Sequence, residues 1–465
     1  MRGEGAIEME HYCIHGLRSI RIAIAILTLV SLPAGGAVAA NQINSCTTID
    51  LPGEYVLNQS ILNSPASPAC IFITSSNVIF DGAEYTISGE DTPWTYGVYV
   101  YNPVALINVT VRNLNVTDWY YGIYYNNTGN GTIRGNNASN NSNGIVLDFS
   151  SNNVLSGNIA SYNVLGIYVN SSSSNNLGSN HIFGNGNGII MDFSSNNNLS
   201  RNNASDNKVG IYLSDSSINS LNSNIVSNNN MGVILASSSN NNLSGNNVSW
   251  NAFFGIWLQN SSSNTLSDNN ILNNGIYVIP QSFPIGAVGG SFPIGGIILD
   301  SSSHNNLSGS ISSNNSHGIV LNSSSNNTLN SNIANSNNEY GIFLLNSSSN
   351  TIYSNIFNNI RNFRIHNSAN SWNITKTKAT NIIGSRYIGG NLWSDPNDTG
   401  FSQTCADSDG DGICDSSYML EPGNIDYLPL AYSTKLIWVL VIILTGFIGA
   451  LVYYFLIRKR IRGNV

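Results

Sequence analysis

The chain has 465 residues, of which only 9% are charged, and it carries a net charge of −8. No basic stripe runs along it, which argues against a nucleic-acid partner. A chain this poor in charge and rich in asparagine and serine could be disordered, and that alternative stays open from composition alone. Strictly periodic aliphatic residues favour an ordered repeat protein instead.

The first 40 residues resemble an export signal. Two arginines precede an apolar run at 22–32, and a stretch of small residues follows at 37–40. The leading segment is long for a signal peptide, so translation from Met9 instead of Met1 is an alternative. A retained membrane anchor is the other alternative. We expect export, with residues 1–40 removed as a signal peptide.

Residues 41–96 are predicted to form an N-terminal cap that shields the open edge of the first coil. This segment contains Cys46 and Cys70, and a second pair, Cys405 and Cys414, lies near the other end. Two cysteines at each end fit one disulfide per end in an oxidising compartment. Four free thiols are the alternative.

Residues 97–373 repeat with a period of about 22, most regularly from Gly144 onward. Each unit opens with Gly-Ile-x-Leu or a close variant, whose period of two indicates a strand. A lone aliphatic residue follows (Leu155, Leu177, Leu199, Leu221), then asparagines such as Asn158 and Asn180. Three short strands per repeat predict an all-β fold, a right-handed parallel β-helix of about 12 coils.

The recurring asparagines are expected at turns, in left-handed or Asx-turn geometry, with amides bonded from coil to coil. An interruption at 276–295 contains the phrase Ser-Phe-Pro-Ile-Gly twice. Proline cannot donate to a central ladder, so we expect this piece to leave the stack as a loop. Loops on rigid scaffolds often bind ligands, and an inert insertion is the alternative.

Residues 374–435 are predicted to form a C-terminal cap with an aspartate-rich loop. Alternate carboxylates at Asp407, Asp409, Asp411 and Asp415, with the carbonyl of Ile413, match an oxygen-ligand calcium loop. The usual acid at the twelfth position is absent, because Tyr418 stands there. We expect structural calcium that fixes the cap; a solvated acidic turn is the alternative.

Residues 436–457 contain no charge and are long enough to cross a bilayer. The basic tail 458–465 is then cytoplasmic by the positive-inside rule, with the β-helix on the extracellular side of the cell membrane. A buried soluble helix is the alternative. The 20 Asn-x-Ser/Thr sequons are candidate glycosylation sites on an exported chain.

The repeat phrases, the Gly-Asn-Leu-Trp-Ser-Asp run at 390–395, the aspartate-rich loop and Asp-Tyr-Leu-Pro-Leu at 426–430 resemble NosD-type proteins. These belong to the wider carbohydrate-binding and sugar-hydrolase group of β-helices, and the tail is similar to that of archaeal surface members. The resemblance covers roughly residues 45–430. It implies a right-handed parallel β-helix and two functions, copper supply to nitrous oxide reductase and carbohydrate chemistry.

Copper delivery needs clustered histidine, methionine or cysteine ligands. The histidines of the exterior portion, His181, His304, His317 and His366, are scattered in the sequence. Metal delivery of the NosD kind is therefore the second alternative function.

Carbohydrate chemistry could use Asp148 and Asp192, which occupy equivalent places two coils apart. Their strand spacing is about 9.6 Å, near the upper limit for an inverting acid/base pair. Asn170 fills the same place in the coil between them, and an Asx turn explains all three without catalysis. A polysaccharide hydrolase or lyase is the first alternative function.

Binding has a separate basis in the outward position of Gly-Ile-x-Leu. This position holds Tyr124, Tyr168, Tyr212 and Trp257 in alternate coils. An aromatic stripe about 10 Å apart suits stacking on an extended glycan. Ordinary β-propensity on an exposed sheet is the alternative. The leading hypothesis is a non-catalytic, membrane-anchored extracellular protein that binds surface glycans or serves in the cell envelope.

Overall fold

The computed structural model describes residues 40–65, 68–276 and 294–432. The predicted export signal (all but residue 40), most of the predicted loop 276–295 and the predicted transmembrane helix 436–457 lie outside the described residues. Within those three described ranges, no helix is long and apolar enough to cross a membrane.

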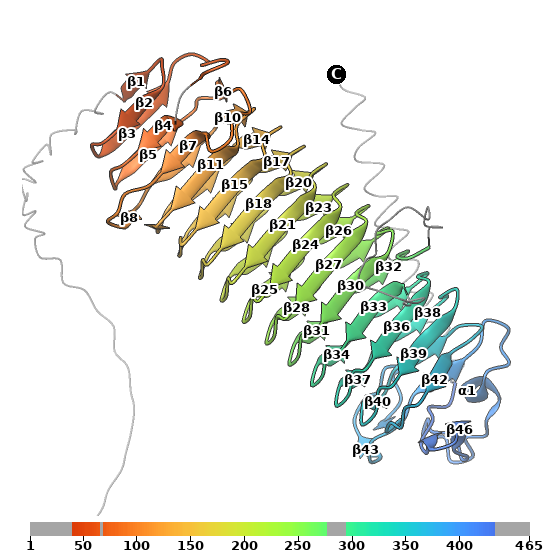
Figure 1. Cartoon of the computed structure of the whole chain (residues 1–465). Helices are drawn as coiled ribbons and strands as arrows, with labels where there is room; N and C mark the ends of the chain where they lie inside the picture. The colour runs from red at the N-terminus through yellow and green to blue at the C-terminus, as the bar shows by residue number, and fades with distance from the viewer. Residues whose placement is uncertain (1–39, 66–67, 277–293, 433–465) are drawn as a thin grey trace, which may run out of the picture. The chain divides into compact units, whose positions relative to one another are not determined.

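The described chain winds through three parallel sheets, and most coils contribute one strand to each of them (Figure 1). Sheet A contains the strands β1 (Asn41–Ile43), β3 (Gly53–Leu57), β5 (Val78–Asp81), β9 (Thr110–Arg112), β13 (Thr132–Arg134), β16 (Val154–Ser156), β19 (Asn176–Gly178), β22 (Asn198–Ser200), β25 (Ser220–Asn222), β28 (Asn242–Ser244), β31 (Thr265–Ser267), β34 (Asn306–Ser308), β37 (Thr328–Asn330) and β40 (Thr351–Tyr353). Sheet B contains β2 (Thr47–Ile49), β4 (Ala69–Ile73), β7 (Tyr96–Val100), β11 (Tyr121–Asn126), β15 (Asn143–Asp148), β18 (Leu165–Asn170), β21 (Asn187–Asp192), β24 (Val209–Ser214), β27 (Met231–Ala236), β30 (Phe254–Gln259), β33 (Gly295–Asp300), β36 (His317–Asn322), β39 (Tyr340–Leu345) and β42 (Phe363–His366). Sheet C contains β6 (Thr86–Ser88), β10 (Asn115–Thr117), β14 (Asn137–Ser139), β17 (Ile159–Ser161), β20 (His181–Phe183), β23 (Asn203–Ser205), β26 (Ile225–Ser227), β29 (Asn247–Ser249), β32 (Asn270–Leu272), β35 (Ile311–Ser313), β38 (Ile333–Asn335), β41 (Ile356–Asn358) and β45 (Leu392–Ser394).

A few short strands and one short helix lie outside the three large sheets. The remaining strands pair as β8 (Leu106–Ile107) with β12 (Thr128–Gly129), β43 (Thr377–Lys378) with β44 (Tyr387–Ile388), and β46 (Tyr418–Glu421) with β47 (Asn424–Asp426). One short helix, α1 (Phe401–Thr404), lies in the C-terminal segment. The predicted all-β parallel β-helix, with three strands in a coil of about 22 residues, is confirmed.

The number of coils was predicted too low. Sheets A and B have 14 strands each, against about 12 coils expected. The difference arises because residues 41–96 lack the Gly-Ile-x-Leu phrase and yet supply β1 to β6 of the three sheets. The predicted disulfides, Cys46–Cys70 in this first part and Cys405–Cys414 near the other end, are both present.

The core is a set of aliphatic columns along the inside of the sheets. Leu155, Leu177, Leu199 and Leu221 pair in direct register in sheet A, and each is at most 1% exposed. Stacking of equivalent side chains is therefore confirmed. Each coil buries its apolar side chains against the coils above and below, so stability depends on neighbouring repeats.

The glycine that opens each repeat is required by the close approach of successive coils in sheet B. A Cβ on Gly144 would lie 2.6 Å from the carbonyl oxygen of Gly166. A Cβ on Gly166 would meet Gly188 at the same distance. Any larger residue would push two coils apart at this corner.

Buried asparagines form hydrogen-bonded ladders at the corners, as predicted. The Asn158 backbone N–H and Nδ2 both donate to Oδ1 of Asn180, at 3.1 and 3.0 Å, and Nδ2 also donates to the Ile133 carbonyl. The predicted left-handed geometry belongs to another residue, the one before each ladder asparagine. Gly157 and Ser179 have φ of 61° and 55°. The asparagine itself is turned inward, where its amide satisfies backbone groups that would otherwise be buried without partners.

The interruption after β32 leaves the stack intact. β30 pairs directly with β33, with Ile256 opposite Ile297 and Leu258 opposite Leu299. The described residues on either side of the interruption therefore lie at one corner, between β32 of sheet C and β33 of sheet B.

Candidate functional site

The outward side of sheet B carries the predicted aromatic stripe. Successive strands place in one column the residues Phe72, Tyr99, Tyr124, Val146, Tyr168, Ile190, Tyr212, Ile234, Trp257, Ile298, Val320 and Phe343. The four aromatic residues predicted as ligand-binding are partly exposed and stand in alternate coils. The aliphatic residues between them are buried although they point outward.

Tyr124 and Tyr168 explain this burial, because each ring lies across the next coil. Tyr124 on β11 stands opposite Val146 on β15. Its hydroxyl donates to Oδ2 of Asp148, at 2.7 Å, and Asp148 lies two residues after Val146 on β15. The ring therefore crosses Val146, which is only 1% exposed. One ring face packs on the aliphatic side chain, and the ring also contacts the rings of Tyr96, Tyr99 and Tyr121 at 4.8–5.5 Å.

The same arrangement recurs two coils later. The Tyr168 hydroxyl donates to Oδ2 of Asp192, at 3.1 Å, and Ile190 between them is 7% exposed. At Tyr212 the position corresponding to the aspartate is Ala236, which offers no side-chain acceptor. Two of the four rings are thus fixed by a carboxylate of the following coil.

Asp148 and Asp192, the candidate catalytic acids, do occupy equivalent register positions, with Asn170 between them. Nδ2 of Asn170 donates to Oδ1 of Asp148 at 2.8 Å. Burial raises the pKa of Asp192, and the hydroxyl of Tyr168 partly offsets that increase. Burial, followed by the neighbouring Asp148 carboxylate, also raises the pKa of Tyr124. Burial, followed by the Asp192 carboxylate, raises the pKa of Tyr168 in the same way. Both tyrosines therefore remain neutral hydrogen-bond donors at physiological pH.

Sheet B is also free of basic residues over most of its length. The strands from β4 to β39 contain no lysine or arginine, whereas Asp148, Asp192 and Asp300 lie on them. Arg364 on β42 is the first cation of this sheet, and its guanidinium lies 5.2 Å from the centre of the Phe343 ring. The aromatic stripe is thus bordered by negative charge.

A second aromatic feature lies on the first coils of the same sheet and was missed in the sequence. Tyr96 stacks on Tyr99 at 4.3 Å and on Tyr121 at 4.9 Å, with planes within 12° of parallel. Phe72 continues the stack on Tyr99 at 5.2 Å. Here the consecutive strands β4, β7 and β11 each carry an aromatic residue, so neighbouring rings cover one another. The signal was the density of aromatic residues at 96–101 and 119–125.

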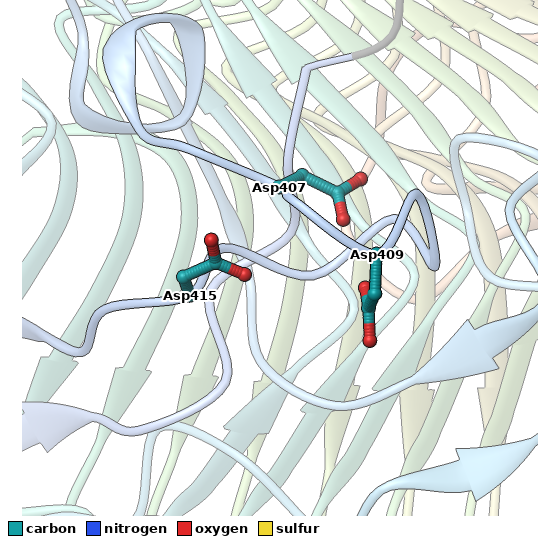
Figure 2. Close-up of side chains that lie close together, drawn as sticks. All are labelled: Asp407, Asp409 and Asp415. Carbon is teal, nitrogen blue, oxygen red and sulfur yellow. The ribbon is translucent and has the colours of Figure 1, made fainter.

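The aspartate-rich loop brings together three of its five predicted calcium ligands. One carboxylate oxygen from each of Asp407, Asp409 and Asp415 lies within 4.8 Å of the others (Figure 2). Backbone N–H groups of Asp411 and Gly412 donate to the two oxygens of Asp407 at 3.1 and 3.0 Å. The donor set consists of hard oxygen atoms, which fits calcium.

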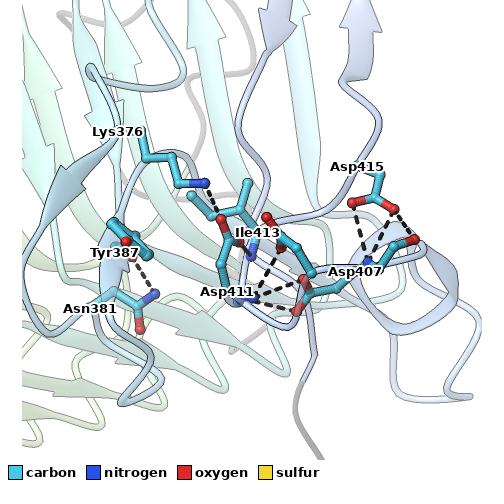
Figure 3. A network of polar contacts seen from close by, with 10 residues as sticks. Lys376, Asn381, Tyr387, Asp407, Asp411, Ile413 and Asp415 are labelled. Atoms are coloured by element: carbon cyan, nitrogen blue, oxygen red, sulfur yellow. Dashed lines mark hydrogen bonds and ion pairs between the residues drawn. The ribbon is translucent and has the colours of Figure 1, made fainter.

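The fourth predicted carboxylate ligand lies in a separate arrangement. Asp411 forms an ion pair with Lys376 and accepts the backbone N–H of Ile413 at 2.8 Å (Figure 3). The Ile413 side chain is buried, in a cluster with Leu392 and Leu430. Lys376, which is 31 residues before Asp407 in sequence, thus holds the Asp411 side chain away from the Asp407, Asp409 and Asp415 trio.

The histidines considered for copper do not form a ligand cluster in the described part of the chain, where the single grouping of three or more His, Cys, Asp or Glu side chains is the aspartate trio. His317 is instead packed against Phe343 at 5.8 Å, and its Nδ1 is bonded to the Ile294 carbonyl. Burial lowers the pKa of His317.

Comparison with known families gives two matches. Residues 96–248 match the model "Right handed beta helix region", and residues 290–398 match "Periplasmic copper-binding protein (NosD)". No curated protein matches the chain.

Solved structures give likenesses of low identity. The A-module of mannuronan C-5 epimerase AlgE4 from Azotobacter vinelandii is 18% identical, with a TM-score of 0.46, over 72% of this chain and 87% of that one. A variant of the periplasmic alginate epimerase AlgG is 16% identical, with a TM-score of 0.43, over 70% and 76%. The DFA-IIIase of Arthrobacter chlorophenolicus A6 is 13% identical, with a TM-score of 0.41, over 57% and 82%. No activity or substrate follows from these likenesses. The two family matches and the three-sheet coil identify the chain as a right-handed parallel β-helix protein with NosD-like repeats.

Proposed function

We propose that the protein is a non-catalytic glycan-binding protein and that the outward side of sheet B is its binding face. The observation that carries this proposal is the orientation of Tyr124 and Tyr168, whose rings lie across the next coil and remain partly exposed. Apolar sugar faces stack on such rings, and the neighbouring hydroxyl, amide and carboxylate groups supply hydrogen-bond partners.

The spacing of these rings suits a linear ligand. Tyr124 and Tyr168 are two coils apart, which corresponds to about 9.6 Å of strand spacing. This is close to the length of two sugar units in an extended chain. A glycan lying along the stack could therefore contact several rings at once, which adds modest individual contacts into useful avidity.

The test is a glycan-binding screen of the full chain and of a Tyr168→Ala, Tyr212→Ala, Trp257→Ala variant. We expect the parent to retain one or more glycans and the variant to lose at least tenfold in affinity. The matched control replaces three exposed aromatics outside sheet B, Phe149, Tyr162 and Phe193, with alanine. Equal losses in both variants, or no binding by the parent, would remove the proposal.

A carbohydrate-active enzyme is the second candidate. The observation that favours it is the raised pKa of Asp192, which occupies the same register position as Asp148 two coils away. The two carboxyl groups of an acid/base pair need different protonation states. Release of reducing or unsaturated sugars, abolished by Asp192→Asn while binding persists, would establish this function over simple binding.

We also propose that the protein is exported and anchored in the cell membrane by residues 436–457, on the basis of the two apolar runs of the sequence. In whole cells, protease should then digest the β-helix without lysis. Protection of the β-helix in intact cells would contradict this placement.

A structural calcium ion at Asp407, Asp409 and Asp415 is proposed for the C-terminal segment, because three carboxylates converge there. Calcium at 100 times its dissociation constant should stabilise this segment by about 2.7 kcal/mol. Differential scanning calorimetry with calcium and with a chelator measures the shift, which Asp409→Asn should abolish. Asp398→Asn, in a neighbouring loop, is the control and should keep the response.

A further inference from the structure

The carboxylates beside the rings on sheet B bear on which glycans could bind there. Asp148 and Asp192 are half-buried and lie next to the hydroxyl ends of Tyr124 and Tyr168. They are held in place by these hydroxyls and, for Asp148, by the amide of Asn170. A ligand that covers the rings therefore comes within a few ångströms of fixed negative charge.

The chemistry of these carboxylates separates two classes of sugar. A carboxylate has about four acceptor positions, and Asp192 uses one of them for Tyr168. A neutral sugar can donate its hydroxyl groups to the remaining positions. A uronic acid brings its own carboxylate, which has no proton to donate at neutral pH and is repelled at short range.

No lysine or arginine on the middle strands of the sheet compensates this repulsion; Lys208 comes directly before β24, and Arg364 lies on β42. The strands of sheet B from β4 to β39 contain no lysine or arginine. A polyuronate lying along the stripe would place one carboxylate per sugar on strands whose charged residues, between Tyr124 and Trp257, are Asp148 and Asp192. Each further uronate unit of the ligand would add one more negative charge.

We propose that the face of sheet B between Tyr124 and Trp257 binds uncharged glycan chains and rejects polyuronates. This inference rests on the proposed glycan-binding function and adds its substrate class. Asp148 and Asp192 act in it as positioning residues, which fix the rings and set the charge selectivity.

The first experiment uses an array of matched glycans that differ at C6, such as β-1,4-linked mannohexaose and the corresponding mannuronate hexamer. The full chain, in buffer with 50 mM salt, should bind the neutral member of a pair at least tenfold more tightly. Equal or tighter binding of the uronate member would overturn the inference while leaving glycan binding in place. Binding of no member would remove the proposed function and the inference together.

The second experiment tests whether the two carboxylates cause the selectivity. In an Asp148→Asn, Asp192→Asn variant, the ratio of uronate to neutral dissociation constants should fall by about fivefold, since asparagine keeps an acceptor for each tyrosine hydroxyl. The control variant Asp206→Asn, Asp268→Asn removes two exposed charges at corners outside sheet B and should keep the parent ratio. In the parent, the ratio should also shrink between 50 and 500 mM salt, because screening weakens the repulsion.

An equal fall in both variants would assign the effect to net charge and overturn the role of Asp148 and Asp192. Thermal unfolding of both variants checks that the coils remain folded. An unchanged ratio in a folded Asp148→Asn, Asp192→Asn protein would also overturn that role.

Discussion

The first coils of sheet B and its middle coils have the same inside and different outsides. Ile71, Val98 and Ile123 form the inner column of the first coils, and Ile145 and Ile167 continue it without a break. On the outside, the strands β4, β7 and β11 each carry aromatic residues, and the rings cover one another (Phe72, Tyr96, Tyr99, Tyr121). In the middle coils, aromatic and aliphatic residues alternate.

This difference shows how one backbone supports two uses of tyrosine. In the first coils, nearly parallel rings 4.3–5.2 Å apart bury their faces against each other and contribute to stability. Tyr124, on β11, stands at the boundary and contacts both this stack and Val146. In the middle coils, Tyr168 lies over Ile190 and remains partly exposed. Because the inside is the same, substitutions can test each part separately.

The largest effect is expected from the shared interior. Leu199 is fully buried between Leu177 and Leu221. Leu199→Asp places an unpaired charge in this column and should destabilise the protein by more than about 4 kcal/mol. Denaturant unfolding followed by circular dichroism measures the change. The outward neighbour Asn198 offers the control, Asn198→Asp, which should stay within about 1 kcal/mol of the parent. Parent-like unfolding of Leu199→Asp would mean that the inward register is wrong.

The fold could be predicted because its constraints repeat at a fixed distance in the sequence. The glycine at the close approach, the buried leucine and the ladder asparagine recur every 22 residues from Gly144. The first coils obey the same constraints with other residues. Phe80 fills a sheet A interior position where the regular repeats have leucine, and Trp119 precedes β11 at a corner that asparagine occupies in the next coil. The period alone therefore underestimated the stack.

The candidate site could be predicted only in part. A period of two places Tyr124 and Tyr168 outward, and that was visible in the sequence. Their orientation depends on Asp148 and Asp192, each 24 residues further along, in a neighbouring coil. The diversion of Asp411 by Lys376 is likewise a contact between separate segments. Such contacts carry no local pattern.

The second prediction separates the two uses of tyrosine. Tyr96→Ala with Tyr99→Ala removes the centre of the stack on the first coils and should lower the free energy of unfolding by about 3 kcal/mol. Glycan binding by the middle coils should persist, because no ring of the stripe from Tyr168 onward is changed. The counterpart, Tyr168→Ala, should lose binding with a smaller loss of stability. Thermal unfolding and glycan titration of both variants measure the two effects, and a loss of binding equal to that of Tyr168→Ala would contradict the division.

The third prediction concerns the end of the asparagine ladder, where the regular interior gives way to an acid. Asp426 is buried and accepts the Asn391 backbone N–H at 2.8 Å and Trp393 Nε1 at 2.9 Å. Burial raises its pKa to about 6, although these donors act in the opposite direction. The folded protein therefore holds the proton more tightly than the unfolded chain does. The contribution of protonated Asp426 to the free energy of unfolding is fully present below about pH 4 and is lost as the pH rises to about 6.

Between pH 4 and pH 6 the free energy of unfolding of the parent should fall by about 2 kcal/mol because of Asp426. Asp426→Asn cannot titrate, so the difference in stability between parent and variant should change with pH between 4 and 6 and become constant above 7. Thermal unfolding at a series of pH values measures it. A difference that does not vary with pH would show that Asp426 has the same pKa in both states.

The smallest effect is expected at a corner where one coil departs from its neighbours. Ile218 has φ of 61°, a left-handed conformation that β-branched residues disfavour, while Asn196 and Asn240 occupy the same corner in adjacent coils. Because Ile218 is 62% exposed, Ile218→Asn removes little buried surface and should stabilise the protein by about 1 kcal/mol. Ile225, which is 46% exposed in the extended strand β26, provides the comparison. Ile225→Asn should be neutral or slightly destabilising, since no backbone strain is relieved there. A stability gain of equal size at both positions would show that the added polar side chain, and not the relief of backbone strain, causes the effect. The left-handed corner positions would then tolerate any residue, as the outward positions of the strands do.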